Sequence, residues 1–489
     1  MKKILLVYPG FIVREVPLNI LYISAALRQA GYDTKVFELT KYLRKNSIVN
    51  PLKRILSDLS ELLDYYQPDM VGFSVMTVGY YLTREMAYVV KQKGIKVIFG
   101  GIHPTIAPEQ TITESFVDFV CVGEGETSFV NLLNSYFADE DYRHTGGIWS
   151  KDTNGEIYSN EVESLATDLD SIPFPDRDAL DSRYYNAELT GANVLTSRGC
   201  PYPCSFCQNK FLLNLYKGKG PFVRYRSVEN IFGELQLIIS KYGAKSFYFS
   251  DETFTMNKKR TLDFLNKYRL RFKSMPFMCE TRIDCVDNEI MEALKEAGCH
   301  QLNIAIESGN ESIRNQVLNK KISDEQIRTA FRLAKKYNIK TQSFNMIGIP
   351  GETMENIFET ISINKEVRPD RVLCTIFMPF GGTELGEACI EKGMIIADIK
   401  DSSIYYSQVT IQHEDLSPGQ LIGYQGFFDW YIALSRRLYF LVGLFRMIYQ
   451  FLVPPMPYKN SLLNYFREKI IELIYQSKRF IMVKTIKNR

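Results

Sequence analysis

Three cysteines lie close together near the middle of the 489-residue chain, at Cys200, Cys204 and Cys207. With nine cysteines in the chain, chance would produce this C-x3-C-x2-C spacing only roughly 0.003 times. Such closely spaced thiols are typical of a soft metal centre, either zinc or an iron–sulfur cluster. A structural zinc would take a fourth ligand from nearby, but the next 40 residues contain neither Cys nor His. Three protein ligands on a cluster would leave one iron open to a substrate or cofactor.

Buried strands and helices alternate from residue 193 onwards, and the cysteines directly follow the first of these strands. The predicted strands are 193–197, 246–250, 277–281, 301–306, 341–346 and 371–378. The predicted helices are 228–242, 260–272, 288–297, 324–337 and 354–366. Six such steps with right-handed crossovers predict a parallel (β/α)6 barrel, or part of one, with its site at the carboxyl ends of the strands.

Residues 1–138 contain an earlier alternation of strands and helices. The predicted strands are 3–8, 34–39, 70–75, 96–99 and 117–122, and the predicted helices are 18–30, 52–65, 81–92 and 126–137. Continuous apolar strands joined by helices predict a doubly wound parallel sheet, whose ligands bind beyond the carboxyl ends of the strands. Glycines at those ends leave room for a bulky ligand, although ordinary strand-to-helix turns would also explain them.

The cysteine motif resembles the signature of the radical S-adenosylmethionine (SAM) enzymes, which is C-x3-C-x-aromatic-C after the first strand of a βα barrel. Phe206 is the aromatic residue of the motif. The resemblance implies that the three cysteines hold a [4Fe–4S] cluster whose open iron binds SAM through its amino and carboxylate groups. Electron transfer would then cleave SAM to a 5′-deoxyadenosyl radical, and the protein would position and shield these cofactors.

The same resemblance implies SAM contacts at the ends of the next four strands. Asp251 and Glu252 would meet the ammonium group of SAM, and Arg282 would pair with its carboxylate. Glu307 would accept both ribose hydroxyls. The residues near the adenine would be Gly348, Pro350 and Gly351. A surface acid, an arginine ion pair or a turn explains each residue alone, but their order, one strand apart, favours a SAM site.

A doubly wound domain before such a barrel resembles the cobalamin-binding subclass of radical SAM enzymes, which includes C-methylases and a few ring-forming enzymes. Cobalamin would then lie between the carboxyl edge of the sheet and the mouth of the barrel. The residues expected to contact it are Pro9, Ser74, Met76, Thr77, Val78, Gly100, Gly101, His103, Gly123, Glu124 and Gly125.

One departure concerns the lower face of the cobalt. Many cobalamin domains carry Asp-x-His-x-x-Gly after the first strand, and no histidine follows the first strand here. We expect the loop 76–78 to cover the lower face instead. His103 is expected to be a turn histidine bonded to cofactor amides or backbone, with a cobalt ligand as the alternative. Cys121 is the one cysteine of this domain, which argues against the methylthiotransferase relatives with their three additional cluster cysteines.

The charge balance is nearly even, at +3 overall, and gives no case for nucleic-acid binding. Residues 436–489, however, carry eleven Lys or Arg against two acids, a net of +9. Residues 427–453 are aromatic and apolar and are broken by Arg436, Arg437 and Arg446. This region predicts either a helical lid on the barrel or, with the basic charge beside it, an amphipathic element that contacts anionic lipid. Without a recognisable signal peptide or membrane span, we expect a cytoplasmic protein, with peripheral contact at the inner face of the membrane as the alternative.

These patterns together predict a cobalamin-binding domain (1–138), a linker with a small hairpin (139–190), a radical SAM barrel (191–385) and a C-terminal helical region (386–489). The leading hypothesis is a cobalamin-dependent radical SAM enzyme that methylates an unactivated carbon by way of methylcobalamin. Its substrate would be a small or lipid-like molecule, and its electron donor an external protein such as flavodoxin or ferredoxin. The alternatives are a cyclase or oxidoreductase that uses cobalamin without methyl transfer, and a non-catalytic cobalamin or iron–sulfur sensor.

Overall fold

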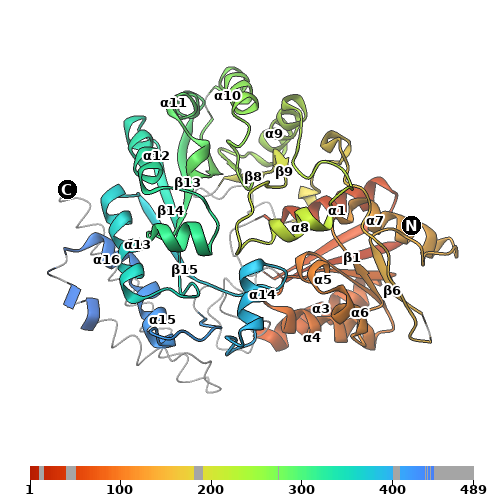
Figure 1. Ribbon diagram of the computed structural model, residues 1–489. Helices are drawn as coiled ribbons and strands as arrows, with labels where there is room; N and C mark the ends of the chain where they lie inside the picture. The colour runs from red at the N-terminus through yellow and green to blue at the C-terminus, as the bar shows by residue number, and fades with distance from the viewer. Residues whose placement is uncertain are drawn as a thin grey trace.

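The computed structural model describes residues 1–9, 16–39, 51–152, 154–180, 191–273, 275–399, 408–435, 437, 439–440 and 442–444. It contains two α/β units that lie side by side, joined through the linker (Figure 1). The predicted fold class is confirmed: a parallel-dominated sheet comes first, a six-stranded parallel sheet follows, and helices come last.

The N-terminal unit is built on a seven-stranded sheet with the order β2-β1-β3-β4-β5-β6-β7. The first five strands are parallel, and the last two are antiparallel additions. The order 2-1-3-4-5 is that of flavodoxin-like sheets. The strands are β1 (Lys3–Tyr8), β2 (Asp33–Glu38), β3 (Met70–Ser74), β4 (Lys96–Gly100), β5 (Phe119–Cys121), β6 (Ile148–Lys151) and β7 (Ile157–Tyr158).

Helices cover both faces of this sheet, because strand residues alternate between the two sides. Leu5 and Val7 of β1 pack in one core with α3 and α4, whereas Ile4 and Leu6 pack in another with α1 and α7. The four central residues of β1 are therefore all buried. The helices of the unit are α1 (Leu18–Gln29), α3 (Pro51–Tyr66), α4 (Tyr80–Gln92), α5 (Ile102–Ile106), α6 (Pro108–Thr113) and α7 (Gly125–Phe137).

The second unit is a partial barrel with the strand order β15-β14-β13-β12-β11-β8, in which all neighbours are parallel. Its helices line the outer side of the curved sheet (Figure 1). The strands are β8 (Ala192–Val194), β11 (Phe247–Phe249), β12 (Phe277–Thr281), β13 (Cys299–Glu307), β14 (Lys340–Ile347) and β15 (Arg371–Ile376). The outer helices are α9 (Val228–Tyr242), α10 (Lys258–Phe272), α11 (Asn288–Glu296), α12 (Asp324–Lys336) and α13 (Met354–Val367).

A short hairpin connects the first barrel strand to the site. It pairs β9 (Ser197–Arg198) with β10 (Arg224–Tyr225), and between them lie the three cysteines and α8 (Asn209–Leu215). The linker is tied to the barrel at Arg177, a buried residue of the 3-10 turn η2 (Arg177–Ala179). Its guanidinium donates to Glu234 Oε1 at 2.6 Å and to the carbonyl of Asn193 at 2.7 Å.

The last described helices are α14 (Glu384–Glu391), α15 (Pro418–Gly426) and α16 (Phe428–Ala433). Phe427, Phe428 and Trp430 pack in a core with β14, β15 and α13. The start of the predicted lid or lipid-binding region is thus packed on the barrel, while the basic residues from 445 onwards lie outside the described residues. Among the helices that the structure describes, none combines the length and apolarity needed to cross a membrane.

Candidate functional site

The three cysteines lie in the loop between β9 and α8, with Cys204 buried and Cys200 and Cys207 half-buried. Burial, together with negative charge on Cys207, Glu252 and Cys204 and against a backbone hydrogen bond, raises the pKa of Cys200 to about 11. Burial also raises the pKa of Cys207, with a contribution from Cys204. These mutual effects indicate that the three thiols lie near one another. A bound metal centre would supply the positive charge that converts such thiols to thiolate ligands.

In the described part of the chain, no three His, Cys, Asp or Glu side chains are grouped to hold a single metal ion. A [4Fe–4S] cluster binds each cysteine through a different iron, so it takes sulfurs that are spaced more widely than the ligands of one ion. The donor set of three neighbouring thiols therefore fits a cluster.

The segment from Val317 to Lys320 supports the cysteine loop. The backbone N–H of Ser205 donates to the carbonyl of Leu318 at 3.1 Å, and the side-chain amide of Asn319 donates to the carbonyl of Pro203 at 2.9 Å. This segment follows a π-helical turn, Ile313–Val317. The sequence pattern does not predict this turn. Turns of this kind are frequent at functional sites.

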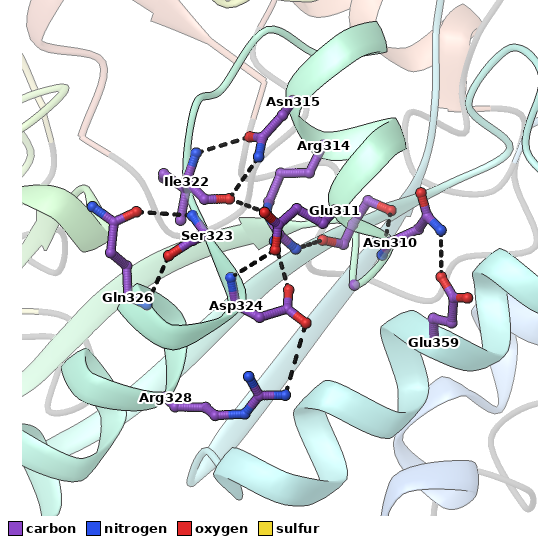
Figure 2. A network of polar contacts seen from close by, with 12 residues as sticks. Asn310, Glu311, Arg314, Asn315, Ile322, Ser323, Asp324, Gln326, Arg328 and Glu359 are labelled. Atoms are coloured by element: carbon purple, nitrogen blue, oxygen red, sulfur yellow. Dashed lines mark hydrogen bonds and ion pairs between the residues drawn. The ribbon is translucent and has the colours of Figure 1, made fainter.

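Arg314 fixes this supporting segment from inside the protein (Figure 2). Its guanidinium is fully buried and donates to the carbonyls of Ser308 and Ile322, both at 2.8 Å, and to Asp324 Oδ1 at 2.6 Å. One side chain therefore holds the irregular loop after β13 at both ends, and this loop in turn contacts the cysteine loop at Ser205 and Pro203.

Arg282 lies beside Cys204 at the end of β12. Its Nη1 is 3.5 Å from the Cys204 Sγ, its Nη2 donates to the carbonyl of Lys320 at 2.8 Å, and its Nε donates to Asp284 Oδ1 at 3.0 Å. The guanidinium also stacks 3.7 Å from the centre of the Tyr202 ring. The predicted SAM-carboxylate partner thus uses its donors within the protein, on and around the cysteine loop.

The adjacent carboxylates Asp251 and Glu252 point in different directions. Asp251 is fully buried, and its Oδ1 accepts the backbone N–H and hydroxyl of Thr196, both at 3.0 Å, and the Ser197 hydroxyl. Glu252 instead lines a cavity and contributes to the electrostatics of Cys200. Glu252 is exposed toward this cavity, and partial desolvation by the protein around it, with the negative charge of Asp251, raises its pKa. Of the two predicted ammonium partners, Glu252 is the one that faces the cavity.

Glu307 ends β13 in a left-handed backbone conformation with φ +66°, beside a register shift in the pairing with β14. Its Oε1 forms an ion pair with the buried Lys320 Nζ at 3.1 Å. Lys320 was not predicted as a site residue, since a lysine within a polar loop belongs to no motif. The pair joins the predicted ribose-binding carboxylate to the segment that supports the cysteines.

The predicted adenine loop is a tight turn organised by Glu352. Gly348 and Gly351 have φ values of +72° and +77°, which favour glycine. Glu352 Oε2 accepts the N–H of Gly348 at 2.6 Å and that of Ile349 at 3.3 Å. Pro350 lies between these residues. A Cβ on Gly351 would meet no atom within 4 Å, so this part of the backbone is open to an approaching ligand.

A cavity of about 410 Å³ lies at the carboxyl edge of the N-terminal sheet and extends to the barrel unit. Its N-terminal wall includes apolar residues such as Leu6, Ile98 and Phe129. From the barrel come Ser197, Arg198, Gly199 and Glu252. The predicted cobalamin contacts that line the cavity are Ser74, Gly100, Gly101, Gly123, Glu124 and Gly125.

Two of the glycines that line this cavity are required by close packing behind its wall. A Cβ on Gly101, which has φ +100°, would lie 2.9 Å from the carbonyl oxygen of Val75, and one on Gly72 would lie 3.1 Å from the Leu6 side chain. A cavity that is largely apolar and bounded by glycines fits part of a bulky cofactor such as cobalamin.

The remaining predicted cobalamin contacts do not line this cavity: Pro9, Met76, Thr77, Val78 and His103. His103 is buried, with its Nδ1 3.2 Å from the Thr77 hydroxyl and its ring centre 4.6 Å from that of the Tyr80 ring, at a tilt of 52°. His103 lies in the short helix α5 after β4, and its imidazole contacts Thr77 and Tyr80 within the N-terminal unit.

The fold and the two neighbouring sites define an enzyme class in which a cobalamin domain precedes a radical SAM barrel. The B12 binding domain model matches residues 12–133, and the Radical SAM superfamily model matches residues 194–362. An uncharacterized methyltransferase of Pyrococcus horikoshii is 30% identical over 406 residues, covering 81% of this chain and 84% of that protein. The chain therefore belongs to the B12-binding radical SAM family, and it is a cobalamin-dependent radical SAM enzyme.

Two further matches are a relative named as a cyclase and a solved structure. The anaerobic magnesium-protoporphyrin IX monomethyl ester cyclase of Cereibacter sphaeroides is 26% identical over 446 residues, covering 88% of this chain and 68% of that protein. The structure of the cobalamin-dependent SAM radical enzyme OxsB, with aqua-cobalamin and SAM bound, is 18% identical and superposes with a TM-score of 0.66 over 100% of this chain and 80% of that one. The superposition supports the fold, and a [4Fe–4S] cluster, SAM and cobalamin are cofactors of the family.

Proposed function

We propose that this enzyme transfers a methyl group to an unactivated carbon of a small or lipid-like molecule. The observation that carries the proposal is the single cavity shared by the glycine-rich edge of the sheet and the hairpin that leads into the cysteine loop. Methyl transfer of this kind requires the radical source and the methyl carrier to serve one substrate position. A shared chamber meets this requirement, and the Pyrococcus relative carries the name of a methyltransferase.

Within this proposal, the cysteines would hold the cluster and the glycine-lined cavity would hold part of the cobalamin. When bound, the cluster and SAM would supply one-electron chemistry, and cobalamin would carry the methyl group. Glu252 would accept hydrogen bonds from the SAM ammonium, because its carboxylate faces the cavity next to the cysteines. Apolar lining residues such as Leu195, Leu212 and Phe222 would exclude water from the reacting atoms.

A second candidate is a ring-forming reaction that uses cobalamin without methyl transfer. The similarity to the cyclase of Cereibacter sphaeroides favours it, because that relative matches 88% of this chain. The same cavity would serve either reaction, so the fate of the methyl group separates them.

The test is an anaerobic incubation of the reconstituted enzyme with methyl-deuterated SAM. The substrate source is a small-molecule and lipid extract of cells that lack the gene, and a reduced flavodoxin supplies electrons. We expect 5′-deoxyadenosine and a product that carries the intact deuterated methyl group, both detected by mass spectrometry. A new product without deuterium would reject methyl transfer and support cyclisation. No 5′-deoxyadenosine under any condition would reject both reactions and favour a sensor.

A further inference from the structure

Two carboxylates of the N-terminal unit are paired with two guanidiniums of the barrel unit. Glu124 and Glu126 follow β5, and Arg198 and Arg224 lie on the β9–β10 hairpin. Both terminal nitrogens of Arg224 donate to the Glu124 carboxylate: Nη1 to Oε2 at 3.1 Å, and Nη2 to Oε1. Arg198 bridges the two acids, with Nη1 3.2 Å from Glu124 Oε2 and Nη2 2.6 Å from Glu126 Oε1. We call these four residues the inter-unit clamp.

The clamp is shielded from solvent on the barrel side. The Arg224 side chain is 2% exposed and that of Arg198 is 16% exposed. Burial alone would raise the pKa of Glu124. Hydrogen bonds from Arg224 and the charge of Arg198 outweigh burial and hold this pKa below its usual value. Because an unpaired buried guanidinium is strongly unfavourable, the hairpin is stable in this position only while the carboxylates remain in contact with it.

The loop after β5, which carries Glu124, also contacts the barrel unit at a second point, after the cysteines in the sequence. The backbone N–H of Glu124 donates to the hydroxyl of Tyr216, immediately after α8, at 2.6 Å. Gly123 has φ +83°, and a Cβ there would overlap the Tyr216 hydroxyl. Arg198 precedes the cysteines and Tyr216 follows them, so both ends of the segment 199–215 are bound to one loop of the N-terminal unit.

We propose that Glu124 and Glu126 are positioning residues that fix the cysteine loop relative to the cobalamin-binding edge of the sheet. The proposal rests on the proposed function, since a fixed distance between the two cofactors matters only when both act on one substrate. It also gives Glu124 a different role from the cobalamin contact that the sequence predicts. The Glu124 carboxylate is paired with Arg224 of the barrel unit. Glu124 lines the cavity because the loop after β5 forms part of the cavity wall.

The first test uses the protein without added cofactors, by hydrogen exchange and mass spectrometry. The variant is Glu124→Gln with Glu126→Gln, which keeps side-chain shape and removes both charges. The control is Glu161→Gln, because Glu161 forms an exposed 2.7 Å ion pair with Lys219 that also joins the region before the barrel to the segment after α8. We expect peptides within 199–216 to exchange about tenfold faster or more in the double variant. Peptides from β13 and β14 should be unchanged, and the control should match the wild type.

Unchanged exchange within 199–216 in the double variant would overturn the proposal. Faster exchange in β13 and β14 as well would indicate general destabilisation and would also count against a positioning role. Arg198→Lys provides a second comparison, because it keeps the charge but cannot bridge both acids. An intermediate rate is expected for it.

The second test measures the cofactor geometry in the reduced holoenzyme by electron paramagnetic resonance. The spin–spin interaction between the cluster and the cobalt should be well defined in the wild type and weaker or broader in the double variant, at unchanged iron and cobalt content. Methylated product per 5′-deoxyadenosine should fall about tenfold or more, because small misplacements of reacting groups are costly. An unchanged spin interaction would overturn the proposal. Absence of bound cobalt in the wild type would refute the proposed function, while the exchange experiment would still decide whether the clamp fixes the loop.

Discussion

Replacing Glu352 by Gln tests whether a neutral carboxyl group organises the loop after β14. Glu352 is 4% exposed, and burial raises its pKa from 4.5 to about 8. Its Oε2 accepts two backbone N–H groups, of Gly348 and Ile349, while its Oε1 has no hydrogen-bond partner among the described residues. The amide of Gln has nearly the shape of the protonated acid and stays neutral at every pH of interest.

The displaced pKa sets the size of the effect. Between pH 4.5 and pH 8 the folded protein keeps a proton that the unfolded chain releases, so the wild type loses stability as the pH rises through this window. Each pH unit corresponds to about 1.4 kcal/mol. With partial ionisation near pH 8 included, the loss between pH 6 and pH 8 is about 2 kcal/mol. The Gln variant lacks this ionisation. Its free energy of unfolding relative to the wild type should therefore increase by about 2 kcal/mol between pH 6 and pH 8.

Urea denaturation followed by tryptophan fluorescence measures the difference. Trp430 packs in the core shared by β14 and α13, and a Trp149→Phe background removes the other tryptophan. Glu355→Gln is the matched control, since Glu355 is exposed in the first turn of α13 and should show no such trend. A wild-type-to-variant difference that stays constant between pH 6 and pH 8 would refute the reasoning, because the carboxyl would then be ionised throughout.

Two further substitutions probe the cysteine loop and its support. Cys204→Ala should abolish the iron content and the visible absorbance of the reconstituted cluster. The control is Cys389→Ala, which removes a buried thiol of α14 and should retain both. Unchanged iron loading in Cys204→Ala would show that the three cysteines are not the ligands. Arg314→Lys should lower the free energy of unfolding by about 2 kcal/mol or more, because it loses hydrogen bonds to buried carbonyls. Arg328→Lys, at a more exposed position in the same network, should stay within about 0.5 kcal/mol of the wild type, and equal effects of the two changes would contradict this account.

The order of the main strands and helices could be predicted because most of the strands have an apolar run and most of the helices an apolar stripe, with the mixed strand β2 as an exception. The run at β1, for example, predicts burial on both faces, and the structure confirms it. The attachment of the β6–β7 hairpin to the N-terminal sheet was not predicted, since antiparallel pairing at a sheet edge depends on a partner that is distant in the sequence. The π-helical turn at Ile313–Val317 was not predicted either; its Arg314 donates to carbonyls outside the turn, which the local sequence does not specify.

The candidate site, like the fold, could be predicted only in part from the sequence. The spacing of the cysteines and the order of polar residues at strand ends predict which loops form the site. They do not predict which of two neighbouring carboxylates faces the cavity: Asp251 binds Thr196, and Glu252 lines the cavity. The partners of Arg282 and Glu307 are likewise set by folding, since both contact Lys320, which belongs to a later loop.

Buried arginines around the site have one physical task in common. The loops that carry the functional residues are irregular and buried, so their carbonyl groups need donors that no helix or sheet provides. An arginine offers five N–H groups in a rigid fork. Arg224, Arg282 and Arg314 each donate to at least one such carbonyl while a carboxylate balances the charge. Apolar side chains of similar volume could not satisfy those carbonyls, and each buried carbonyl left without a donor would cost about 1–3 kcal/mol. We therefore expect substitutions of these arginines to disturb the geometry of the cysteine loop before they unfold the barrel.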